Sequence, residues 1–409
     1  MIPLEEARAH VLARVQRLDT VERETDAARG LVLAEPVVAA EPVPPFDNSA
    51  MDGYAVRAAD TEGAPVELDV VGTLAAGADP AGVHVGAGQA VRIMTGAALP
   101  EGADAIVMVE ATTVLDGGRV RIATAAARED HFRRAGEDIA LGDVVVGAGT
   151  VLTAVHLGVL ASIGAAKVSV VRRARVGVLS TGDELVEGTA PLRPGQLRDS
   201  NRHSLIAHVA ADGCKVVDLG LVRDDRDAVA AAITGASMSC DALLTSGGVS
   251  MGDYDEVKAV LSELSDDMRW MQMAIRPAKP FAFGTVGTMP VFGLPGNPVS
   301  SLVSYELLAR PSLRKMMGHP DDDLDRPRLA AVAGGPLLRW PDGKVHFARV
   351  VACVDGGQIV VRSAGGQGSH QLAVMGAANA LAVLPDGDGV DTGGAVDVIV
   401  TGELRPLPR

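Results

Sequence analysis

The chain has 409 residues, of which 47% are hydrophobic and 22% charged, so it contains enough apolar material for several buried cores and predicts two to three domains. Its formal net charge of −15 disfavours a broad surface for DNA or RNA. The 3% share of aromatic residues argues against stacking platforms for single-stranded nucleic acid.

The first 19 residues predict an amphipathic helix, with Leu4, Ala7, Val11, Val15 and Leu18 on one side. This segment lacks the basic start and continuous apolar run of a signal peptide. No later stretch reaches the roughly 18 apolar residues of a membrane span. The cysteines are scattered, odd in number and without metal spacing, which indicates reduced thiols. We therefore expect a soluble, cytoplasmic protein without a membrane partner; its cysteines are Cys214, Cys240 and Cys353.

Residues 1 to about 172 predict a β-rich N-terminal region, because short β-like runs alternate with Gly and Pro. A β-subdomain at about 46–138 is expected to be inserted in it. The strands expected are Val66–Val71, Ala90–Met94, Ala105–Val109, Arg119–Ile122 and Val144–Val146, followed by a helix at Thr153–Ile163 and a strand at Lys167–Val171.

Residues 173–318 have a different pattern, in which predicted strands alternate with longer helices. This alternation predicts right-handed βαβ units and a mainly parallel sheet, as in doubly wound α/β domains. Residues 327–409 return to short strands and predict a small all-β domain. The strands expected in the middle domain are Arg175–Leu179, Lys215–Leu219, Asp241–Thr245 and Met289–Phe292, and the helices are about Ser200–Ala211, Asp225–Thr234, Tyr254–Leu264 and Pro298–Met317.

Four polar loops follow the strands of the middle domain, at residues 180–185, 222–225, 245–250 and 293–300. Ligands of open α/β sheets bind beyond the carboxyl ends of the strands. We therefore expect the side chains of these loops to meet at one edge of the sheet.

The chemistry of these loops predicts a phosphate-bearing ligand with a divalent metal. A Gly-rich turn can cradle phosphate on backbone N–H groups, and a helix that starts at Asn297-Pro298 attracts anions. Carboxylates nearby suit Mg²⁺. Each loop alone is compatible with an ordinary turn, and only their joint occurrence at one edge favours a site. The candidates are Thr245, Ser246, Gly247, Gly248, Ser250, Pro295, Asn297, Pro298 and Ser300 for substrate, and Glu184, Asp224 and Asp253 for metal.

Two further polar features stand outside these loops. The segment 276–280 holds Arg276 and Lys279 between prolines, which suits pairing with phosphate or an oxyanion, although an exposed basic turn is an alternative. The first region has polar turns at 44–55, 94–104 and 134–139, and spacing alone does not connect them to the middle domain.

Eight strings together resemble one family, the molybdopterin molybdenumtransferases of the MoeA and gephyrin E-domain type. They occur in the order of that family, and the resemblance as a whole covers the chain from about residue 2 to residue 403. The strings are FDNSAMDGYAVR (46–57), RIMTGAALPEGADAIVMVE (92–110), RAGEDI (134–139), VGVLSTGDEL (176–185), LTSGGVSMGDYD (244–255), IRPAKPFAFG (275–284), GLPGNPVSS (293–301) and GQGSH (366–370).

The resemblance implies a homodimer whose subunit has four parts, with a molybdopterin-binding α/β domain in the middle and a small β-barrel at the end. It also implies an active cleft between the middle domain of one subunit and the N-terminal β-subdomain of the other. Family positions carried over to this chain are Asp52, Thr95, Asp138, Glu184, Asp224, Asp253, Arg276, Lys279, Pro295, Pro298, Arg349 and Ser369.

The reaction implied is Mg²⁺-dependent cleavage of adenylylated molybdopterin, with capture of molybdate by the dithiolene and release of AMP. Glu184, Asp224 and Asp253 would then hold the metal near the phosphates, and Arg276 and Lys279 would attract molybdate. The family often has lysine where Arg276 stands, and glycine where Ala278 stands. Neither departure removes a charge.

Three other interpretations remain open from the sequence. A molybdopterin adenylyltransferase shares the α/β domain but normally lacks the flanking regions; it is also a candidate partner of this chain. A gephyrin-like scaffold would have no catalysis, but the carboxylates are present and no long linker or recognition tail is seen. An inactive paralogue would keep the same fold. The choice between molybdate and tungstate stays open as well.

Overall fold

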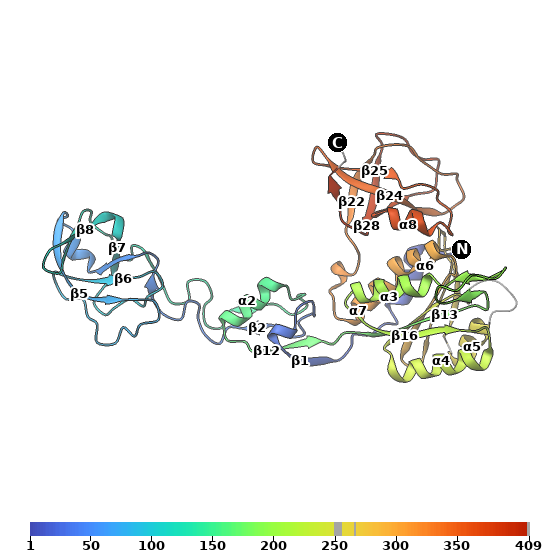
Figure 1. The fold of residues 1–409 in the computed structure, drawn as a ribbon, viewed down its shortest axis with the longest axis horizontal. Coiled ribbons are helices and arrows are strands. Elements are labelled where there is room, and N and C mark those ends of the chain that lie inside the picture. Colours follow the sequence, from blue (N-terminus) through green and yellow to red (C-terminus); the bar gives the residue numbers. More distant parts are fainter. Residues whose placement is uncertain (249–255, 266, 407–409) are drawn as a thin grey trace. The chain divides into compact units, whose positions relative to one another are not determined.

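The computed structural model describes residues 1–248, 256–265 and 267–406. The chain forms two compact units, of which unit 2 comprises residues 22–29 and 35–169 and unit 1 comprises residues 1–21, 30–34 and the chain from 170 onward (Figure 1). The expected N-terminal region, residues 1–172, is thus divided between the units. The reason is that the first helix buries Ala7 and Val11 in the core of the α/β domain.

Unit 2 contains a six-stranded sheet of order β7-β4-β6-β5-β9-β8. Alternate residues face two small cores, so Tyr54 and Val56 pack on one side and Ala55 on the other. The expected β-rich character of this region is confirmed. The strands are β4 (Gly53–Val56), β5 (Val66–Leu74), β6 (Gln89–Ile93), β7 (Ala105–Met108), β8 (Thr112–Leu115) and β9 (Arg119–Ile122).

Smaller elements complete residues 20–171. They are β1 (Thr20–Glu24), β2 (Val37–Val38), β3 (Asn48–Ser49), β10 (Phe132–Arg133), β11 (Val144–Val146), β12 (Lys167–Val171), the helix α2 (Ala154–Ser162) and the 3₁₀ turns η1 (Thr25–Ala27), η2 (Ala58–Thr61) and η3 (Val109–Ala111). Thr153 caps α2 by accepting a hydrogen bond from the N–H of His156, which agrees with the helix expected there.

Unit 1 contains the expected doubly wound α/β domain, built on a sheet of order β16-β13-β17-β21-β20-β18. The first four strands pair in parallel. The antiparallel strands β20 and β18 were missed because prolines and a basic loop interrupt their pattern. The strands are β13 (Arg175–Thr181), β16 (Lys215–Val222), β17 (Ala242–Ser246), β18 (Arg269–Gln272), β20 (Pro280–Val286) and β21 (Met289–Leu294).

Helices cover both faces of this sheet (Figure 1). Val178, Leu244 and Phe292 face one core, whereas Leu179, Leu243 and Val291 face the other. Nearly continuous apolar strands are typical of a parallel sheet buried on both sides. The helices are α1 (Leu4–Leu12), α3 (Asn201–Ala211), α4 (Arg226–Ser239), α5 (Glu256–Leu264), α6 (Pro298–Ser304) and α7 (Arg310–Met316).

The helix expected at 298–317 is interrupted by a π-helical segment, η4 (Tyr305–Ala309). Pro311 has no N–H for the carbonyl of Leu307, one turn before it. Arg8 of α1 donates to that carbonyl at 3.2 Å. The first helix therefore satisfies a backbone group that the proline leaves free.

The C-terminal part of unit 1 forms the expected small β-barrel. Strand β24 pairs with both β25 and β26, which closes the order β24-β25-β22-β28-β26 into a ring around an apolar core. Strand β19 (Ile275–Arg276) pairs with β24 and joins the α/β domain to the barrel. The barrel strands are β22 (Arg328–Ala333), β24 (Val345–Asp355), β25 (Gln358–Ser363), β26 (Ala380–Leu384) and β28 (Ala395–Val400).

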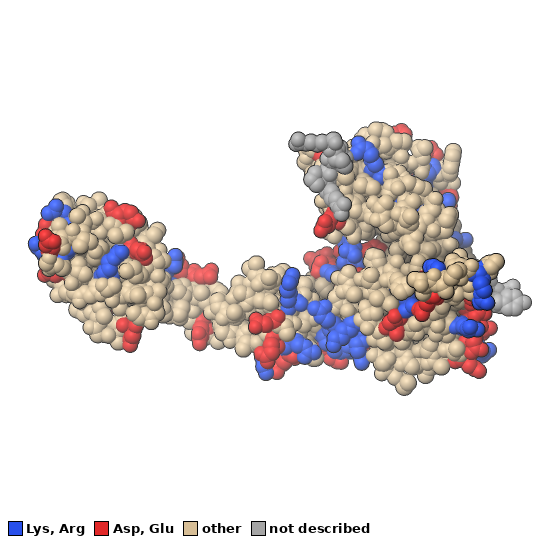
Figure 2. All heavy atoms as spheres, in the orientation of Figure 1, with Lys and Arg blue, Asp and Glu red and all other residues tan. Residues whose placement is uncertain are grey.

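The remaining elements of unit 1 are short. They are β14 (Leu185–Val186), β15 (Leu197–Arg198), β23 (Leu337–Leu338), β27 (Gly389–Val390), β29 (Arg405–Pro406), the 3₁₀ turn η5 (Asp321–Asp323) and the helix α8 (Leu372–Ala377). Acidic and basic side chains both occur on the visible face of each unit (Figure 2). Among the described helices, none has the length and apolar character needed to cross a membrane.

We predict that Asp241→Asn lowers the free energy of unfolding at pH 7 by about 2 to 3 kcal/mol, because the buried carboxylate accepts hydrogen bonds from Arg172 and Arg175. Although burial opposes them, these bonds hold the pKa of Asp241 well below its usual range. The stabilisation is therefore present above the unfolded pKa of about 4 and decreases as the pH falls below it.

The measurement is urea denaturation of both proteins at pH 7 and pH 3, with the exposed Asp355→Asn as control. The gap between wild type and Asp241→Asn should shrink at pH 3. An equal gap at both pH values would contradict the role given to the ion pairs.

Candidate functional site

The four predicted loops lie at one edge of the parallel sheet. Ser180 of β13 pairs in register with Ser246 of β17, and Ser246 pairs with Leu294 of β21. Thr181 pairs with Val222 at the end of β16. The strands therefore end side by side, and the loops at 180–185, 222–225, 245–248 and 293–300 follow them directly.

The turn after β17 requires glycine at two positions. Gly247 has φ +99°, and a Cβ there would lie 2.9 Å from the carbonyl oxygen of Thr181. Gly248 has φ +72°, and its Cβ would lie 2.4 Å from Cβ of Val257. Glycine is therefore required at both positions by close packing against Thr181 and Val257 and by the positive φ of the turn. The N–H of Gly247 itself is bonded to the carbonyl of Leu294 at 3.1 Å, so this donor belongs to the fold.

The hydroxyls of this turn have different environments. Thr245 is fully buried, and its Oγ1 has no hydrogen-bond partner among the described residues. Ser246 Oγ accepts a hydrogen bond from Asn201 at 2.8 Å. Asn201 also donates to the carbonyl of Gly296 at 2.8 Å. One amide at the start of α3 therefore holds the β17 and β21 loops together.

The predicted carboxylates Glu184 and Asp224 are exposed beside a third, Asp183. The N–H groups of Asp183 and Asp224 each donate to the carboxylate of the other at 3.3 Å. Burial raises the pKa of Asp224, and the negative charges of Asp183, Glu184 and Glu256 raise it further. A cation placed beside Asp224 would relieve the repulsion among these carboxylates, so the cluster suits cation binding.

Ser250 and Asp253 lie outside the described residues. Within the described ranges, no group of three or more His, Cys, Asp or Glu side chains converges to hold a metal ion. The assignment of Glu184, Asp224 and Asp253 as ligands thus stays a prediction.

The β21 loop has the predicted form, with Asn297 at the N-cap position and Pro298 at the first position of α6. The Asn297 side chain makes no capping hydrogen bond, however. Pro295 and Ser300 are buried in the same loop. The next amide, of Val299, donates to the carbonyl of Ser369 at 3.0 Å. The start of α6 therefore contacts the barrel loop 366–370.

Arg349 lies in a cavity of about 620 Å³ that is lined by the barrel and by Arg276 and Pro277. Its side chain is 1% exposed and donates to the carbonyls of Gly366 and Gly368. Its Nε has no partner among the described residues. Burial lowers the pKa of Arg349 to about 10, and the positive charge of Arg276 acts in the same direction. The guanidinium is therefore still charged at neutral pH.

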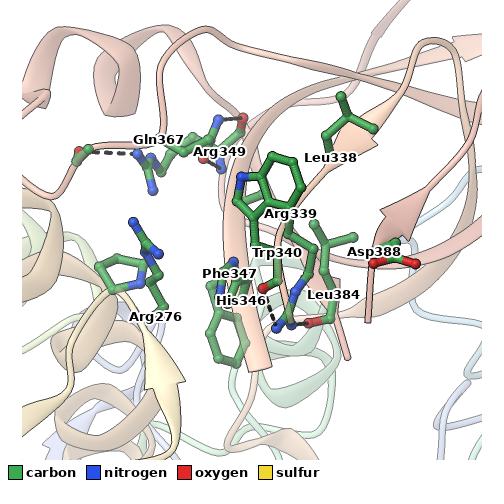
Figure 3. A pocket seen from close by; sticks show the side chains of 13 residues that line it. Arg276, Leu338, Arg339, Trp340, His346, Phe347, Arg349, Gln367, Leu384 and Asp388 are labelled. Carbon is green, nitrogen blue, oxygen red and sulfur yellow. Dashed lines mark hydrogen bonds between the residues drawn. The ribbon is translucent and has the colours of Figure 1, made fainter. Parts of the chain in front are cut away.

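Arg276 faces Arg349 across this cavity (Figure 3). Its partner is Asp342, at 3.9 Å, and its side chain is 62% exposed. Lys279 is exposed further along the same segment and does not line the cavity. Between them Ala278 has φ +74°, a conformation that favours glycine. Three arginines, Arg276, Arg339 and Arg349, line the cavity against one acid, Asp388, so its lining is cationic and can take an oxyanion.

In unit 2 the structure brings Asp52 and Thr95 together. Asp52 Oδ1 accepts hydrogen bonds from the N–H and the hydroxyl of Thr95 at 2.7 and 2.8 Å. The N–H bond is the main reason that the pKa of Asp52 is lowered. Asp138 lies in a separate exposed turn, where its N–H donates to the carbonyl of Val43. Among the described residues, no hydrogen bond joins its side chain to Asp52 or Thr95.

Sequence reasoning missed Asn201 and Asp183. Asn201 is the first residue of α3 and looks like an ordinary helix start, so its link between two distant loops has no local signal. Asp183 lies in the string VGVLSTGDEL, from which the sequence analysis predicts only its neighbour Glu184 as a ligand.

Three family models match the chain: MoeA N-terminal region (domain I and II) at residues 2–164, a probable molybdopterin binding domain at 177–315, and MoeA C-terminal region (domain IV) at 338–401. A molybdopterin molybdenumtransferase from Haemophilus influenzae is 40% identical over 94% of both chains. Molybdopterin molybdenumtransferase 2 from Mycobacterium tuberculosis is 42% identical over 88% of this chain and 89% of its own. The solved molybdopterin biosynthesis moea protein from Pyrococcus horikosii has a TM-score of 0.83 at 31% identity and covers 98% of this chain and 100% of its own.

We predict that Gly247→Ala is more damaging than Gly220→Ala, although both glycines have positive φ. Space is open around Gly220, whereas the new Cβ at Gly247 meets the Thr181 carbonyl. Gly220→Ala should cost about 1 kcal/mol of stability, and Gly247→Ala about 1 to 2 kcal/mol more. Urea denaturation measures both. Equal losses would show that the close approach at Gly247 has no energetic weight.

Proposed function

The chain belongs to the MoeA family of molybdopterin molybdenumtransferases, and we propose that it inserts molybdenum from molybdate into adenylylated molybdopterin with release of AMP. It is thus a transferase of molybdenum cofactor biosynthesis. The observation that carries the finer proposal is the buried Arg349, which has no acidic partner among the described residues. It lies in a cavity, and the adjoining barrel loop hydrogen-bonds the start of α6 at the sheet edge.

Both substrates are anionic: adenylylated molybdopterin carries a diphosphate, and molybdate is an oxyanion. Unit 1 has a region suited to each. The Gly-rich turn 245–248 lies at the carboxyl ends of the parallel strands, where α/β sheets bind ligands, and is the candidate cradle for the phosphates. Arg349 and Arg276 attract molybdate, since arginine presents a fixed fork of donors to an oxyanion. The contact from Val299 N–H to Ser369 O links these two regions.

The chain's own residues would act mainly by orientation and by charge. Asn201 keeps the β17 and β21 loops together, so the phosphate cradle has a fixed shape. Arg276 and Lys279 stabilise negative charge that develops as the bond between the two phosphates breaks and AMP leaves.

We also propose that Mg²⁺ assists, held by Asp224 and Glu184 together with Asp253. The donor set fits a hard divalent cation, because it consists of carboxylate oxygens and because burial, together with the nearby negative charges of Asp183 and Glu184, raises the pKa of Asp224. When bound, Mg²⁺ would neutralise charge on the diphosphate.

The adenylyltransferase alternative is less consistent with the comparisons, since the relatives are similar to this chain over 94% and 88% of its length, including both flanking regions. A scaffold without catalysis does not account for the Arg349 Nε, which has no partner among the described residues, or for the cluster of carboxylates around Asp224. Neither alternative has an observation that favours it.

We further propose a homodimer that works in the cytoplasm, with the adenylyltransferase as a candidate partner. A dimer is supported by apolar side chains that unit 2 exposes around β2, β11 and α2, namely Val38, Leu141, Val144 and Val155. The cytoplasm is supported by three cysteines that are all free and buried.

Asp224→Ala and Asp52→Ala should each lower AMP release at least about a hundredfold, because each removes a carboxylate assigned to the reaction. The circular dichroism spectrum should stay unchanged, because both carboxylates are exposed and outside the cores. Asp355→Ala, an exposed acid of the barrel, is the control. Full activity in either variant would remove that residue from the mechanism.

Mixed dimers test whether one site uses both chains. If Asp52 of one subunit serves the site of the other, a dimer of Asp52→Ala and Asp224→Ala subunits contains one intact site. We expect about half of the wild-type AMP release from purified mixed dimers. Activity no higher than in the two parent variants would contradict the shared site.

Arg349→Gln should raise the molybdate concentration for half-maximal AMP release at least about tenfold, because it removes the buried charge. Arg362→Gln, on neighbouring β25, should change it less than about twofold. An unchanged molybdate dependence in Arg349→Gln would exclude Arg349 from the oxyanion site.

A further inference from the structure

The rim of the Arg349 cavity carries two strongly exposed apolar side chains. Trp340 is 84% exposed and Leu338 is 74% exposed, and both line the cavity together with Arg276 and Arg349. Figure 3 labels Trp340, Arg276 and Arg349 among the side chains that line this cavity. An exposed indole next to a cationic cavity offers a flat face to a ligand whose anionic part lies inside.

The loop that carries Trp340 is anchored by Arg339, whose side chain is 1% exposed. Arg339 donates to the carbonyls of Lys344, Leu384, Pro385 and Trp340 and to the carboxylates of Asp342 and Asp386. A rigid aromatic platform loses little conformational entropy on binding. The backbone that presents Trp340 is therefore anchored at several points.

Asp342 connects this loop to the cavity. It pairs with Arg276 at 3.9 Å and accepts hydrogen bonds from Lys344 and His346 at 2.9 and 3.1 Å. Although burial opposes them, these bonds lower the pKa of Asp342 to about 2. The carboxylate thus stays charged, and it helps to fix both the Trp340 loop and one arginine of the cavity.

We propose that Trp340 is a positioning residue that stacks on the pterin ring of the substrate while molybdate occupies the cavity beside Arg349. This inference rests on the proposed function. The dithiolene that captures molybdenum is attached to the ring system that includes the pterin, whereas the adenine lies beyond the diphosphate. The pterin is therefore the planar ring within reach of a metal held at Arg349.

The test compares Trp340→Ala, Trp340→Phe and Val354→Ala in AMP-release kinetics. Val354 is an exposed apolar residue of β24 that does not line the cavity. Trp340→Ala should raise KM for adenylylated molybdopterin about tenfold with kcat nearly unchanged, as expected for a lost stacking contact. Trp340→Phe keeps a ring and should restore most of the affinity. Val354→Ala should behave as wild type.

Direct binding distinguishes the two rings of the substrate and does not depend on turnover. Calorimetric titration with pterin-6-carboxylate and, separately, with AMP should show that Trp340→Ala weakens pterin binding about tenfold and leaves AMP binding unchanged. An unchanged KM and unchanged pterin affinity would overturn the inference, as would a loss of AMP affinity alone. Absence of AMP release from the wild type would instead count against the proposed function.

Discussion

Parallel pairing of β16, β13, β17 and β21 is the constraint on which the candidate site depends. Because the strands run in the same direction and in register, four loops separated by up to about a hundred residues end at one edge. Glycines at 247 and 248 let the turn after β17 pack closely against Thr181 and Val257, and the Asn201 side chain hydrogen-bonds to the loops after β17 and β21. A shift of one strand in the register would separate these groups.

The barrel depends on the same edge. Strand β19 leaves the α/β domain and pairs with β24, while the N–H of Val299 at the start of α6 reaches the carbonyl of Ser369. These two links place Arg349 and the Trp340 loop beside Arg276. The cationic cavity is therefore made jointly by two domains of unit 1, and neither supplies it alone.

Periodicity and loop chemistry predicted much of this architecture. The positions of β13, β16, β17 and β21 agree with their expected ranges to within a few residues, because buried parallel strands are short apolar runs between polar loops. The antiparallel strands β20 and β18 were missed because proline and charged residues obscure their pattern. The interruption at η4 follows from Pro311 and from Arg8, some 300 residues away, a pairing that no local pattern reveals.

Site residues were predictable where the residue types of a single loop indicate their function, and not where the function depends on contacts between distant segments. The Gly-rich turn and the carboxylates were found from their own loops. Arg349 and Ser369 came only from the family resemblance, since a buried arginine in a barrel strand has no local signature. Asn201 and Trp340 acquire meaning only from what they lie beside in the fold.

The most direct test of the central claim is AMP release from adenylylated molybdopterin by the purified wild-type protein, with and without molybdate. The account predicts that molybdate stimulates the release of AMP and that molybdenum becomes bound to the pterin dithiolene in equal amount. It would be contradicted by AMP release that is independent of molybdate, or by a protein that makes adenylylated molybdopterin from molybdopterin and Mg-ATP instead.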